Sequence, residues 1–476
     1  MGESANFDLV VIGGGPAGYV GAIRASQLGL KVACVELDNL GGICLNWGCI
    51  PTKALLAAAE FYEKLRHDAA GWGILAEPVA HDWSKVIGRS RGVAGNLKKG
   101  IHALFKKNGI AHIEGRARVT APGRLDVLGH YENVVQTIEA RHILVCTGAV
   151  PRSIPGVAFD GDRIITSKEA MSLPEQPEKL IIVGAGATGM EFAYFYHAFG
   201  TQVVVIEMLE HLLPNEDEEV SQAMERVWRK QKIETRLKTR TLGVNKVGDG
   251  VEVTIALVDD KSRAETIVGD KVLVAIGVVG RCEDLFDGSL GVRIEKGHIQ
   301  VDRTTYQTSV PGIYAVGDVI GPPWLAHVAS EEAVVCVERI AGHDPVPIDY
   351  GAIPACTYCH PQVASLGLTE KACRDQGKVG GTDYKVGKFP FQASGKAQAV
   401  GSTEGFVKIL TDAANGEILG VHMIGENVTE LLAEMGLAKR LKATAEEVIT
   451  TMHAHPTLSE AIHEASLGVD GRMIHF

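Results

Sequence analysis

The chain has 476 residues, with 47 Lys and Arg against 58 Asp and Glu, so its formal net charge is −11. This length suggests about three domains, and the acidic balance excludes a general nucleic-acid binder. The 55 glycines are close to 12% of the 476 residues, against an average usage of roughly 7%. With only 18 prolines and 46% hydrophobic residues, the chain is nevertheless neither collagen-like nor disordered. The glycine surplus therefore points to particular positions.

The composition also predicts a protein of the cytoplasm without a membrane partner. No apolar run approaches the roughly 18 residues that span a bilayer, and the first residues lack the basic leader and apolar core of a signal peptide. Nine cysteines in such a chain favour reduced thiols over a disulfide scaffold. A closely spaced pair is then a candidate for catalysis or metal binding.

The chain begins with the fingerprint of a dinucleotide-binding βαβ unit. A glycine-rich turn separates a strand from a helix, and a second strand ends in an acidic residue; these elements are predicted at 7–12, 19–28 and 29–36. In this context Gly13 suits the tight turn, Gly15 the approach of a pyrophosphate and Gly18 the packing of helix on strand. Glu36 suits a ribose hydroxyl. We expect a dinucleotide here.

Two cysteines five residues apart follow this unit. Cys44 and Cys49 lie among glycines, just before an alanine-rich helix predicted at 53–66. They can meet across about one helical turn, and a helix N-terminus lowers the pKa of a thiol. The spacing alone leaves open a pair of buried cysteines in a helix cap.

A second fingerprint repeats the first. A strand at 179–183 leads into Gly184, Gly186 and Gly189, and a helix is predicted at 190–199. The next strand, predicted at 202–206, closes on Glu207. The first glycine and the acid are 23 residues apart in both units, since 36 − 13 = 207 − 184 = 23. Two such units predict an electron-transfer enzyme that holds one flavin and one nicotinamide dinucleotide.

The acid of the second unit favours NAD over NADP. Glu207 would accept hydrogen bonds from a free 2′-hydroxyl and repel a 2′-phosphate, and positions 208–219 contain no Lys or Arg to bind that phosphate.

Three further strands end in glycine, at 142–148, 271–277 and 312–318. The last ends in Gly317 and Asp318, which suits a polar ligand at the carboxyl end of a strand. Beyond residue 348, prolines punctuate short strands, and helices are expected at 429–441 and near 445.

One motif points to different chemistry. Cys356, Cys359 and His360 spell C-x-x-C-H, a haem-attachment pattern. We expect no haem or metal here, because no export signal precedes the motif and because a strand would direct these cysteines to opposite faces. The other cysteines are expected to be small core residues: Cys34, Cys146, Cys282, Cys336 and Cys373.

Taken in order, the two fingerprints, the segment at 41–53, the segment at 316–318 and the tail at 453–460 resemble the flavoprotein disulfide reductase family from end to end. Within this family the chain is most similar to members that oxidise protein-bound dihydrolipoyl groups with NAD. Trp47 and Thr52 depart mildly from the common motif.

The resemblance implies a role for each reacting group. Cys44 matches the thiol that exchanges with the dithiol substrate, and Cys49 matches the thiol that lies against the flavin. His455 matches the base and Glu460 the acid that orients its imidazole. His453 is chemically an equal candidate, and only the match to the family position before a proline favours His455.

The resemblance also implies FAD and NAD as cofactors. Lys53 and Glu191 match a pair beside the reacting flavin edge, and Asp318 a carboxylate near the ribityl chain. The expected FAD contacts are Gly13, Gly15, Gly18, Glu36, Gly42, Lys53, Thr147, Gly148, Asp318, Ala326 and His327. The expected NAD contacts are Gly184, Gly186, Gly189, Glu207 and Gly277.

The predicted fold is α/β, with two Rossmann-like domains and a C-terminal α+β domain. The boundaries expected are 1–150 for the FAD-binding domain, 151–279 for the NAD-binding domain, 280–347 for a central domain that completes the FAD site, and 348–476 for an interface domain. The resemblance implies an obligate homodimer with active sites shared across the interface.

Expected partners are lipoyl-bearing proteins, such as those of 2-oxo acid dehydrogenase complexes or the glycine cleavage system. One alternative is a relative that reduces mercuric ion or a small disulfide, although no cysteine follows Cys373 to form the extra C-terminal pair of mercuric reductases. Another is a structural subunit without a catalytic role. The particular lipoyl partner and the direction of electron flow do not follow from the sequence.

Overall fold

A computed structural model describes residues 5–76, 78–129, 131–260 and 262–476. Contacts divide the chain into two compact units. The first contains the described parts of Met1–Leu55, Ser84–Arg152 and Gly277–Ile348, and the second those of Leu56–Trp83, Ser153–Ile276 and Asp349–Phe476. In these ranges, no helix combines the length and apolar character needed to span a membrane.

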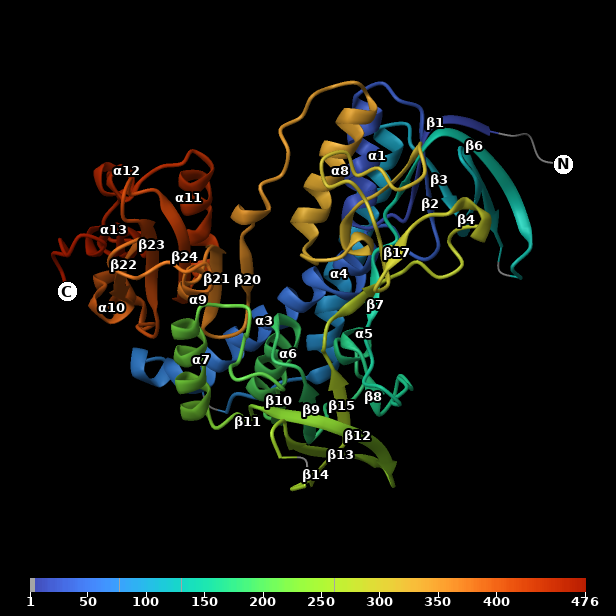
Figure 1. Cartoon of the computed structure of the whole chain (residues 1–476). Helices are drawn as coiled ribbons and strands as arrows, with labels where there is room; N and C mark the ends of the chain where they lie inside the picture. The colour runs from blue at the N-terminus through green and yellow to red at the C-terminus, as the bar shows by residue number, and fades with distance from the viewer. Residues whose placement is uncertain (1–4, 77, 130, 261) are drawn as a thin grey trace. The chain divides into compact units, whose positions relative to one another are not determined.

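The first unit is built on a mixed sheet in the order β3-β2-β1-β6-β5-β4, with β19 paired to β6 (Figure 1). The strands β3, β2, β1, β6 and β19 run parallel, whereas β4 and β5 form an antiparallel extension. The second half of β1 is an apolar run, and its residues Leu9, Val10 and Val11 are fully buried. Such runs are typical of parallel strands covered on both faces.

Helices α1 and α8 pack together beside this sheet (Figure 1). A Cβ atom at Gly21 would lie 3.2 Å from that of Ala333, so the glycine permits a close approach of the two helices. Arg24 and Glu338 pair across them at 2.5 Å. The helix that follows the first glycine loop is thereby held by a helix from far along the chain.

The strands of the first unit are β1 (Ala5–Ile12), β2 (Val32–Glu36), β3 (Ala111–Glu114), β4 (Arg116–Ala121), β5 (Arg124–Leu128), β6 (Val134–Val145), β7 (Ala149–Pro151), β16 (Val278–Gly280), β17 (Ile294–Glu295), β18 (His298–Ile299) and β19 (Ile313–Ala315). Its α-helices, two of which cross its boundaries in sequence, are α1 (Pro16–Gln27), α2 (Gly42–Trp47), α3 (Cys49–Glu63), α4 (Trp83–Lys107) and α8 (Ala326–Ile340). Short 3₁₀ helices lie at Gly288–Leu290 and Gly317–Ile320.

The second unit contains a parallel sheet in the order β11-β10-β9-β15-β8 and an antiparallel sheet in the order β20-β21-β24-β23-β22. A smaller antiparallel sheet joins β12, β13 and β14. Helix α6 connects β9 to β10 of the parallel sheet, and nine of its residues are buried.

The strands of this unit are β8 (Ile164–Ile165), β9 (Lys179–Val183), β10 (Gln202–Ile206), β11 (Glu234–Arg236), β12 (Thr239–Val247), β13 (Gly250–Leu257), β14 (Glu265–Gly269), β15 (Lys271–Val274), β20 (Ala355–Thr357), β21 (Gln362–Gly367), β22 (Tyr384–Pro390), β23 (Phe406–Asp412) and β24 (Ile418–Gly425). The α-helices are α5 (Ser167–Ala170), α6 (Ala187–Ala198), α7 (Glu218–Gln231), α9 (Glu370–Asp375), α10 (Gly395–Val400), α11 (Val428–Arg440), α12 (Ala445–Thr450) and α13 (Glu460–Gly468). A π-helix lies at Lys64–Asp68, and 3₁₀ helices lie at Ala69–Trp72, Tyr350–Ala352 and Phe391–Ala393.

The predicted α/β class and the repeated βαβ pattern are confirmed. Strands β9 and β10 have the predicted ends, but α1 and α6 each begin three residues earlier than predicted. The predicted helix at 53–66 was wrong at both ends, because α3 starts at Cys49 and passes into the π-helix after Glu63. The division into four domains stays a prediction.

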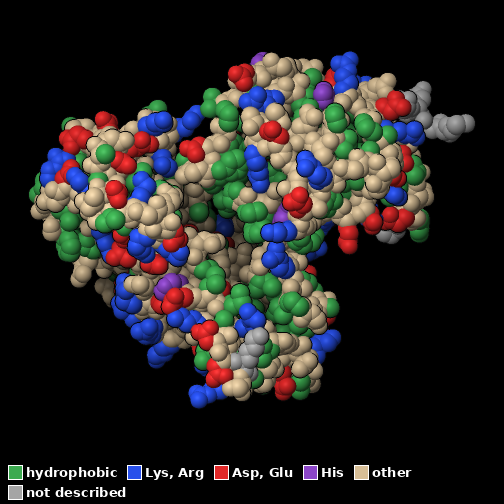
Figure 2. Space-filling model, in the orientation of Figure 1, with side chains coloured by type: hydrophobic (Ala, Val, Ile, Leu, Met, Phe, Trp, Pro, Cys, Tyr) green, Lys and Arg blue, Asp and Glu red, His purple; other side chains and the backbone are tan. Residues whose placement is uncertain are grey.

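Exposed charges of both signs are interspersed over the visible face of the molecule (Figure 2). Many form surface ion pairs, such as that between Lys371 and Asp375. The net negative charge is therefore not gathered into one patch on this face.

One charged group of the second unit is instead completely buried. The ammonium of Lys408 on β23 lies 2.8 Å from Asp217, 3.0 Å from Glu219 and 2.5 Å from Glu370. Burial opposes its charge, but hydrogen bonds to Asp217 and Glu370 raise the pKa of Lys408 overall. These carboxylates lie at the start of α7 and α9, so one lysine ties both helix starts to the antiparallel sheet.

We expect Lys408→Met to lower the free energy of unfolding by about 3–5 kcal/mol, because it leaves the buried carboxylate of Asp217 without its cation. Urea unfolding at pH 7, followed by circular dichroism, measures the change. Lys371→Met is the matched control, since it breaks an exposed pair worth at most about 1 kcal/mol. Equal losses in the two variants would contradict the assignment of Lys408 as a structural link.

Candidate active site

The first glycine loop is held by the acid at the end of β2. Glu36 accepts the backbone N–H of Gly14 at 2.5 Å with one carboxylate oxygen and that of Asp38 at 2.8 Å with the other. The N–H of Gly13 donates to the carbonyl of Val35 at 2.8 Å. The loop and the acid predicted to bind a ribose are therefore one hydrogen-bonded structure.

Two of the predicted glycines allow close backbone packing around this loop. A Cβ atom at Gly18 would overlap the carbonyl of Gly13, and one at Gly42 would lie 2.6 Å from the Cα of Gly15. Helix α1 begins directly after Gly15, with Pro16 in its first turn. An unobstructed helix N-terminus at a glycine loop is an anion site.

A cavity of about 680 Å³ lies beside this loop, within the first unit. Its wall includes Gly13, Glu36 and Thr147. The hydroxyl of Thr147 donates to the carbonyl of Arg281 at 2.7 Å, and the N–H of Arg281 donates to the carbonyl of Gly148 at 2.9 Å. The segment after β6 and the segment after β16 thus hold each other at the cavity.

The cavity also has walls at 115–117 and 280–283. No site residue was predicted in either wall, although the second lies in the segment 280–347 that was expected to complete the FAD site. Gly115 has a φ of +146°, a backbone conformation that favours glycine. A glycine between two strands was therefore a partial sequence signal for the wall at 115–117. The glycine cradle, the helix N-terminus, the acid and the cavity together fit the pyrophosphate and adenosine of FAD.

The second glycine loop has the same construction. Glu207 accepts the N–H of Ala185 and that of Leu209, each at 2.8 Å, and the N–H of Gly184 donates to the carbonyl of Ile206 at 2.8 Å. A Cβ atom at Gly189 would overlap the carbonyl of Gly184. Gly186 is the N-cap of α6. These residues fit a second dinucleotide.

Cys44 and Cys49 form a disulfide, as the candidate redox chemistry requires. Cys44 lies in α2 and Cys49 is the first residue of α3, with Gly48 between the two helices. Both cysteines are half-buried, so the bond is accessible. A Cβ atom at Gly48 would crowd the carbonyl of Ile43 at 3.1 Å, which explains the glycine at this tight turn.

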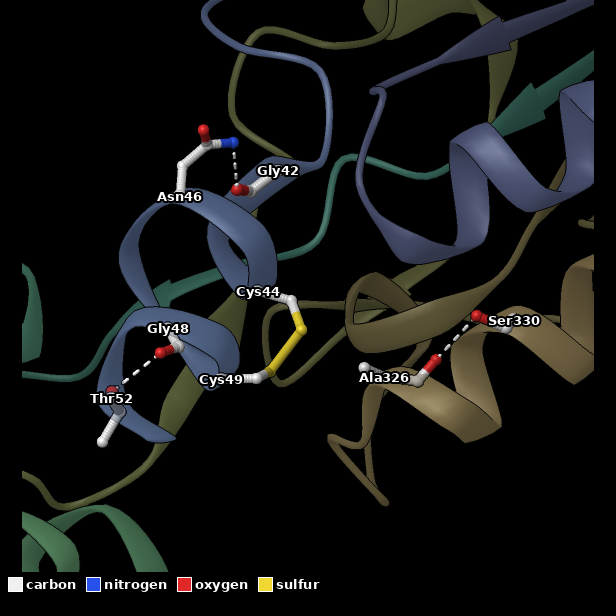
Figure 3. Close-up of a disulfide and its surroundings, with 8 residues drawn as sticks. All are labelled: Gly42, Cys44, Asn46, Gly48, Cys49, Thr52, Ala326 and Ser330. Carbon is white, nitrogen blue, oxygen red and sulfur yellow. Dashed lines mark hydrogen bonds between the residues drawn. A yellow bond between two sulfur atoms is a disulfide. The ribbon is translucent and has the colours of Figure 1, made fainter. Parts of the chain in front are cut away.

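Hydrogen bonds brace the α2–α3 turn on the side away from the sulfur atoms (Figure 3). Asn46 donates to the carbonyls of Gly42 and Leu40, and the Thr52 hydroxyl donates to the carbonyl of Gly48 at 2.7 Å. Thr52, which departs from the family motif, therefore still caps the turn.

Helix α4 supports the same turn. Arg91 donates to the carbonyl of Asn46 at 2.8 Å and lies 4.7 Å from the ring centre of Trp47, and Ser90 donates to the carbonyl of Pro51. A cation over an indole ring is a favourable contact. The second departure from the motif, Trp47, thus has a partner of its own.

Asp318 lies in the 3₁₀ helix that follows β19, close to the first glycine loop. A Cβ atom at Gly317 would lie 3.5 Å from that of Ala17 in α1. Burial and then the charge of Glu332 raise the pKa of Asp318 to about 6. Ala326 and His327 open α8, and Gly277, with a φ of +94°, also belongs to the first unit.

The tail separates the two candidate bases. His455 Nδ1 lies 2.8 Å from Glu460, and the side chain is 78% exposed. His453 is 7% exposed, and its two ring nitrogens contact Glu434 and the carbonyl of Thr451. His455 has an orienting acid and an accessible second ring nitrogen, whereas both ring nitrogens of His453 already have partners.

Glu460 is well suited to orient an imidazole. Burial raises its pKa, but the N–H of Thr457 at 2.9 Å and the ring of His455 lower it below its usual value overall. It is therefore a carboxylate near pH 7. Glu191 in α6 is buried and accepts the N–H of Tyr358 at 3.0 Å, while Lys53 lies in α3. Their expected pairing stays a prediction.

The C-x-x-C-H segment differs in part from expectation. Cys356 lies in β20, but Cys359 lies beyond its end, so the prediction of two cysteines in one strand was wrong. Cys359 is buried and its thiol donates to the carbonyl of Pro361 at 3.5 Å. Of the predicted core cysteines, Cys282 alone is half-buried, and it lines the first-unit cavity.

Comparison with known proteins agrees with this geometry. A family model described as pyridine nucleotide-disulphide oxidoreductase matches residues 7–333, and the model of the dimerisation domain of the same family matches residues 353–466. The structure of LpdA from Mycobacterium tuberculosis has a TM-score of 0.87 at 28% identity, covering 96% of this chain and 98% of that one.

Curated relatives match over the full length. Dihydrolipoyl dehydrogenase of Rhizobium etli is 44% identical over 491 residues and covers 100% of both chains. That of Bacillus subtilis is 42% identical over 99% of this chain and 100% of its own. The mitochondrial enzyme of Pisum sativum is 39% identical over 98% of this chain and 92% of its own. The chain therefore belongs to the pyridine nucleotide-disulphide oxidoreductases, in the dihydrolipoyl dehydrogenase family.

Proposed function

We propose that the protein oxidises protein-bound dihydrolipoyl groups with NAD, through the Cys44–Cys49 disulfide and FAD. The observation that carries this proposal is the accessible disulfide placed directly after the first glycine cradle. An oxidoreductase acting on sulfur needs such a bond, and the full-length relatives bear the name of this activity.

The first cradle, its cavity and Asp318 would hold FAD, and the second cradle would hold NAD. When bound, FAD accepts an electron pair from a thiol pair and passes it on as hydride. Glu207 supports NAD in place of NADP, because its carboxylate already binds two backbone N–H groups and would repel a 2′-phosphate.

The chain's own residues perform the thiol chemistry. A substrate thiolate attacks the sulfur of Cys44, the bond to Cys49 breaks, and Cys49 leaves as a thiolate at the start of α3. The second substrate thiol then displaces Cys44 from the mixed disulfide, which releases the oxidised lipoyl group. His455 takes the proton of the first substrate thiol, and Glu460 stabilises the resulting imidazolium. The proton of the second substrate thiol passes to the thiolate of Cys44 as it leaves.

The match of residues 353–466 to a dimerisation domain supports a homodimer. In the proposed assembly His455 acts across the dimer interface on the disulfide of the other copy. The partners are lipoyl-bearing proteins, such as acyltransferase cores of 2-oxo acid dehydrogenase complexes or a glycine-cleavage carrier. The cytoplasmic location is part of the same proposal.

Purified protein should reduce NAD with dihydrolipoamide in a steady-state assay at 340 nm, and NADP should be a poor substitute. Cys44→Ser should abolish this turnover, because no mixed disulfide can form. Cys373→Ser is the matched control, since this buried cysteine lies outside the site and should leave turnover unchanged.

Turnover of glutathione disulfide or mercuric ion without any turnover of dihydrolipoamide would overturn the proposed substrate. Normal dihydrolipoamide turnover in Cys44→Ser would overturn the proposed route through the disulfide.

His455→Gln should slow the dithiol half-reaction by about 10²–10⁴-fold, which is the usual contribution of a general base. Anaerobic stopped-flow measurement of flavin reduction by dihydrolipoamide reports this step separately from reaction with NADH. The bound flavin content should not change.

His453→Gln is the comparison for this variant, because His453 already has protein partners at both ring nitrogens. We expect its half-reaction to stay within about tenfold of the wild type. An equal or larger effect of His453→Gln would show that the base had been assigned to the wrong histidine.

A further inference from the structure

Glu332 on α8 is a carboxylate buried in the first unit, with 2% of its side chain exposed. Burial first, and then the charge of Glu332, raise the pKa of the nearby Cys336 thiol. A buried charge is costly, and a well-packed apolar residue in its place is often neutral or stabilising. Stability alone therefore does not account for an acid at this position.

The contacts of Glu332 converge on one short turn. One carboxylate oxygen accepts the N–H of Gly317 at 2.7 Å, and the other lies 3.2 Å from a guanidinium nitrogen of Arg303. The second terminal nitrogen of Arg303 donates to the carbonyls of Ile320 at 3.0 Å and Pro322 at 3.4 Å. One carboxylate thus anchors the turn at its start directly and at its end through an arginine.

This turn carries Asp318 and lies against the first glycine cradle. Gly317 has a φ of +77°, and β19 pairs with β6, whose end lies under the glycine loop. A Cβ atom at Gly317 would lie 3.5 Å from that of Ala17, so the turn packs close to the first turn of α1. A shift of the turn would therefore move the Asp318 carboxylate relative to the cradle.

We propose that Glu332 is a positioning residue for the flavin: it clamps Gly317 and Arg303 and so holds the Asp318 turn where its carboxylate can bind the FAD ribityl chain. This inference rests on the proposed function, because it takes FAD as the ligand of the first cradle. Arg303 is a positioning residue of the same turn, because it links Glu332 to the carbonyls of Ile320 and Pro322.

The electrostatics of the turn agree with this role. Burial raises the pKa of Asp318 to about 6, and the charge of Glu332 contributes to the shift. A carboxylate in this position gains from hydroxyl donors, which favour its charged form. A ribityl chain supplies such hydroxyl groups.

The test is the rate of FAD release from the purified full-length holoenzyme, followed by the rise of flavin fluorescence. Glu332→Met keeps the size of the side chain and removes its acceptors, and it should speed release by about 10–100-fold, as expected for lost hydrogen bonds to a charged group. Glu332→Gln keeps an acceptor for the N–H of Gly317, and it should release FAD at a rate much closer to that of the wild type than Glu332→Met does. Glu331→Gln, the exposed neighbour on α8, should leave release unchanged.

Arg303→Met keeps the proposal testable if the Glu332 variants fail to fold, because Arg303 is 39% exposed. We expect about tenfold faster FAD release, with NADH binding unchanged. A wild-type protein that contains no FAD would overturn the proposed function and this inference together. If the wild type holds FAD and Glu332→Met, Glu332→Gln and Arg303→Met all release it at the wild-type rate, this inference alone is overturned.

Discussion

A single carboxylate at the end of a strand fixes the shape of each nucleotide loop. Glu36 binds the N–H of Gly14, and Glu207 binds the N–H of Ala185, at the same position in the two motifs. Each acid also binds a backbone N–H two residues further on. The loop, the strand and the helix N-terminus are therefore ordered before any ligand arrives, which reduces the entropy lost on binding.

The redox centre depends on the first of these loops. Gly42, which opens α2, lies so close to Gly15 that a Cβ atom at Gly42 would be 2.6 Å from the Cα of Gly15. The position of the Cys44–Cys49 pair is thus set by contact with the anion-binding loop. Helix α4 holds the pair from the other direction through Arg91 and Ser90. Two supports of this kind keep a half-buried disulfide in one place while leaving it open to a substrate thiol.

Local patterns were enough to predict the two βαβ units and the cysteine pair, because the strand, glycine and acid signals of each unit lie within about 30 residues of one another. The helix starts were predicted too late. Gly18 and Gly189 have low helix propensity, but each packs on the carbonyl of the first glycine of its loop, and this contact outweighs the propensity. Pro51 in the first turn of α3 is likewise compatible with a helix that begins at Cys49.

The residues that escaped prediction act across long distances in sequence. The contact of Arg91 with Trp47 and the cavity wall at 115–117 depend on segments that no local window contains. The choice between His453 and His455 also depended on tertiary contacts, since Glu434 engages the first histidine and Glu460 orients the second. Sequence alone offered two chemically equal imidazoles, and burial distinguished them.

Two buried charges show why burial by itself does not define a role. Lys408 pairs with three carboxylates that lie at helix starts of the second unit. These contacts connect secondary-structure elements and do not reach a candidate ligand site. Glu332 accepts the N–H of Gly317 and pairs with the guanidinium of Arg303, and these two partners belong to or hold the turn of Asp318. Because that turn borders the nucleotide loop, any change in the carboxylate is transmitted to the place where a ligand would bind. The partner's position in the fold, rather than the strength of the pair, is what separates a structural charge from a positioning one.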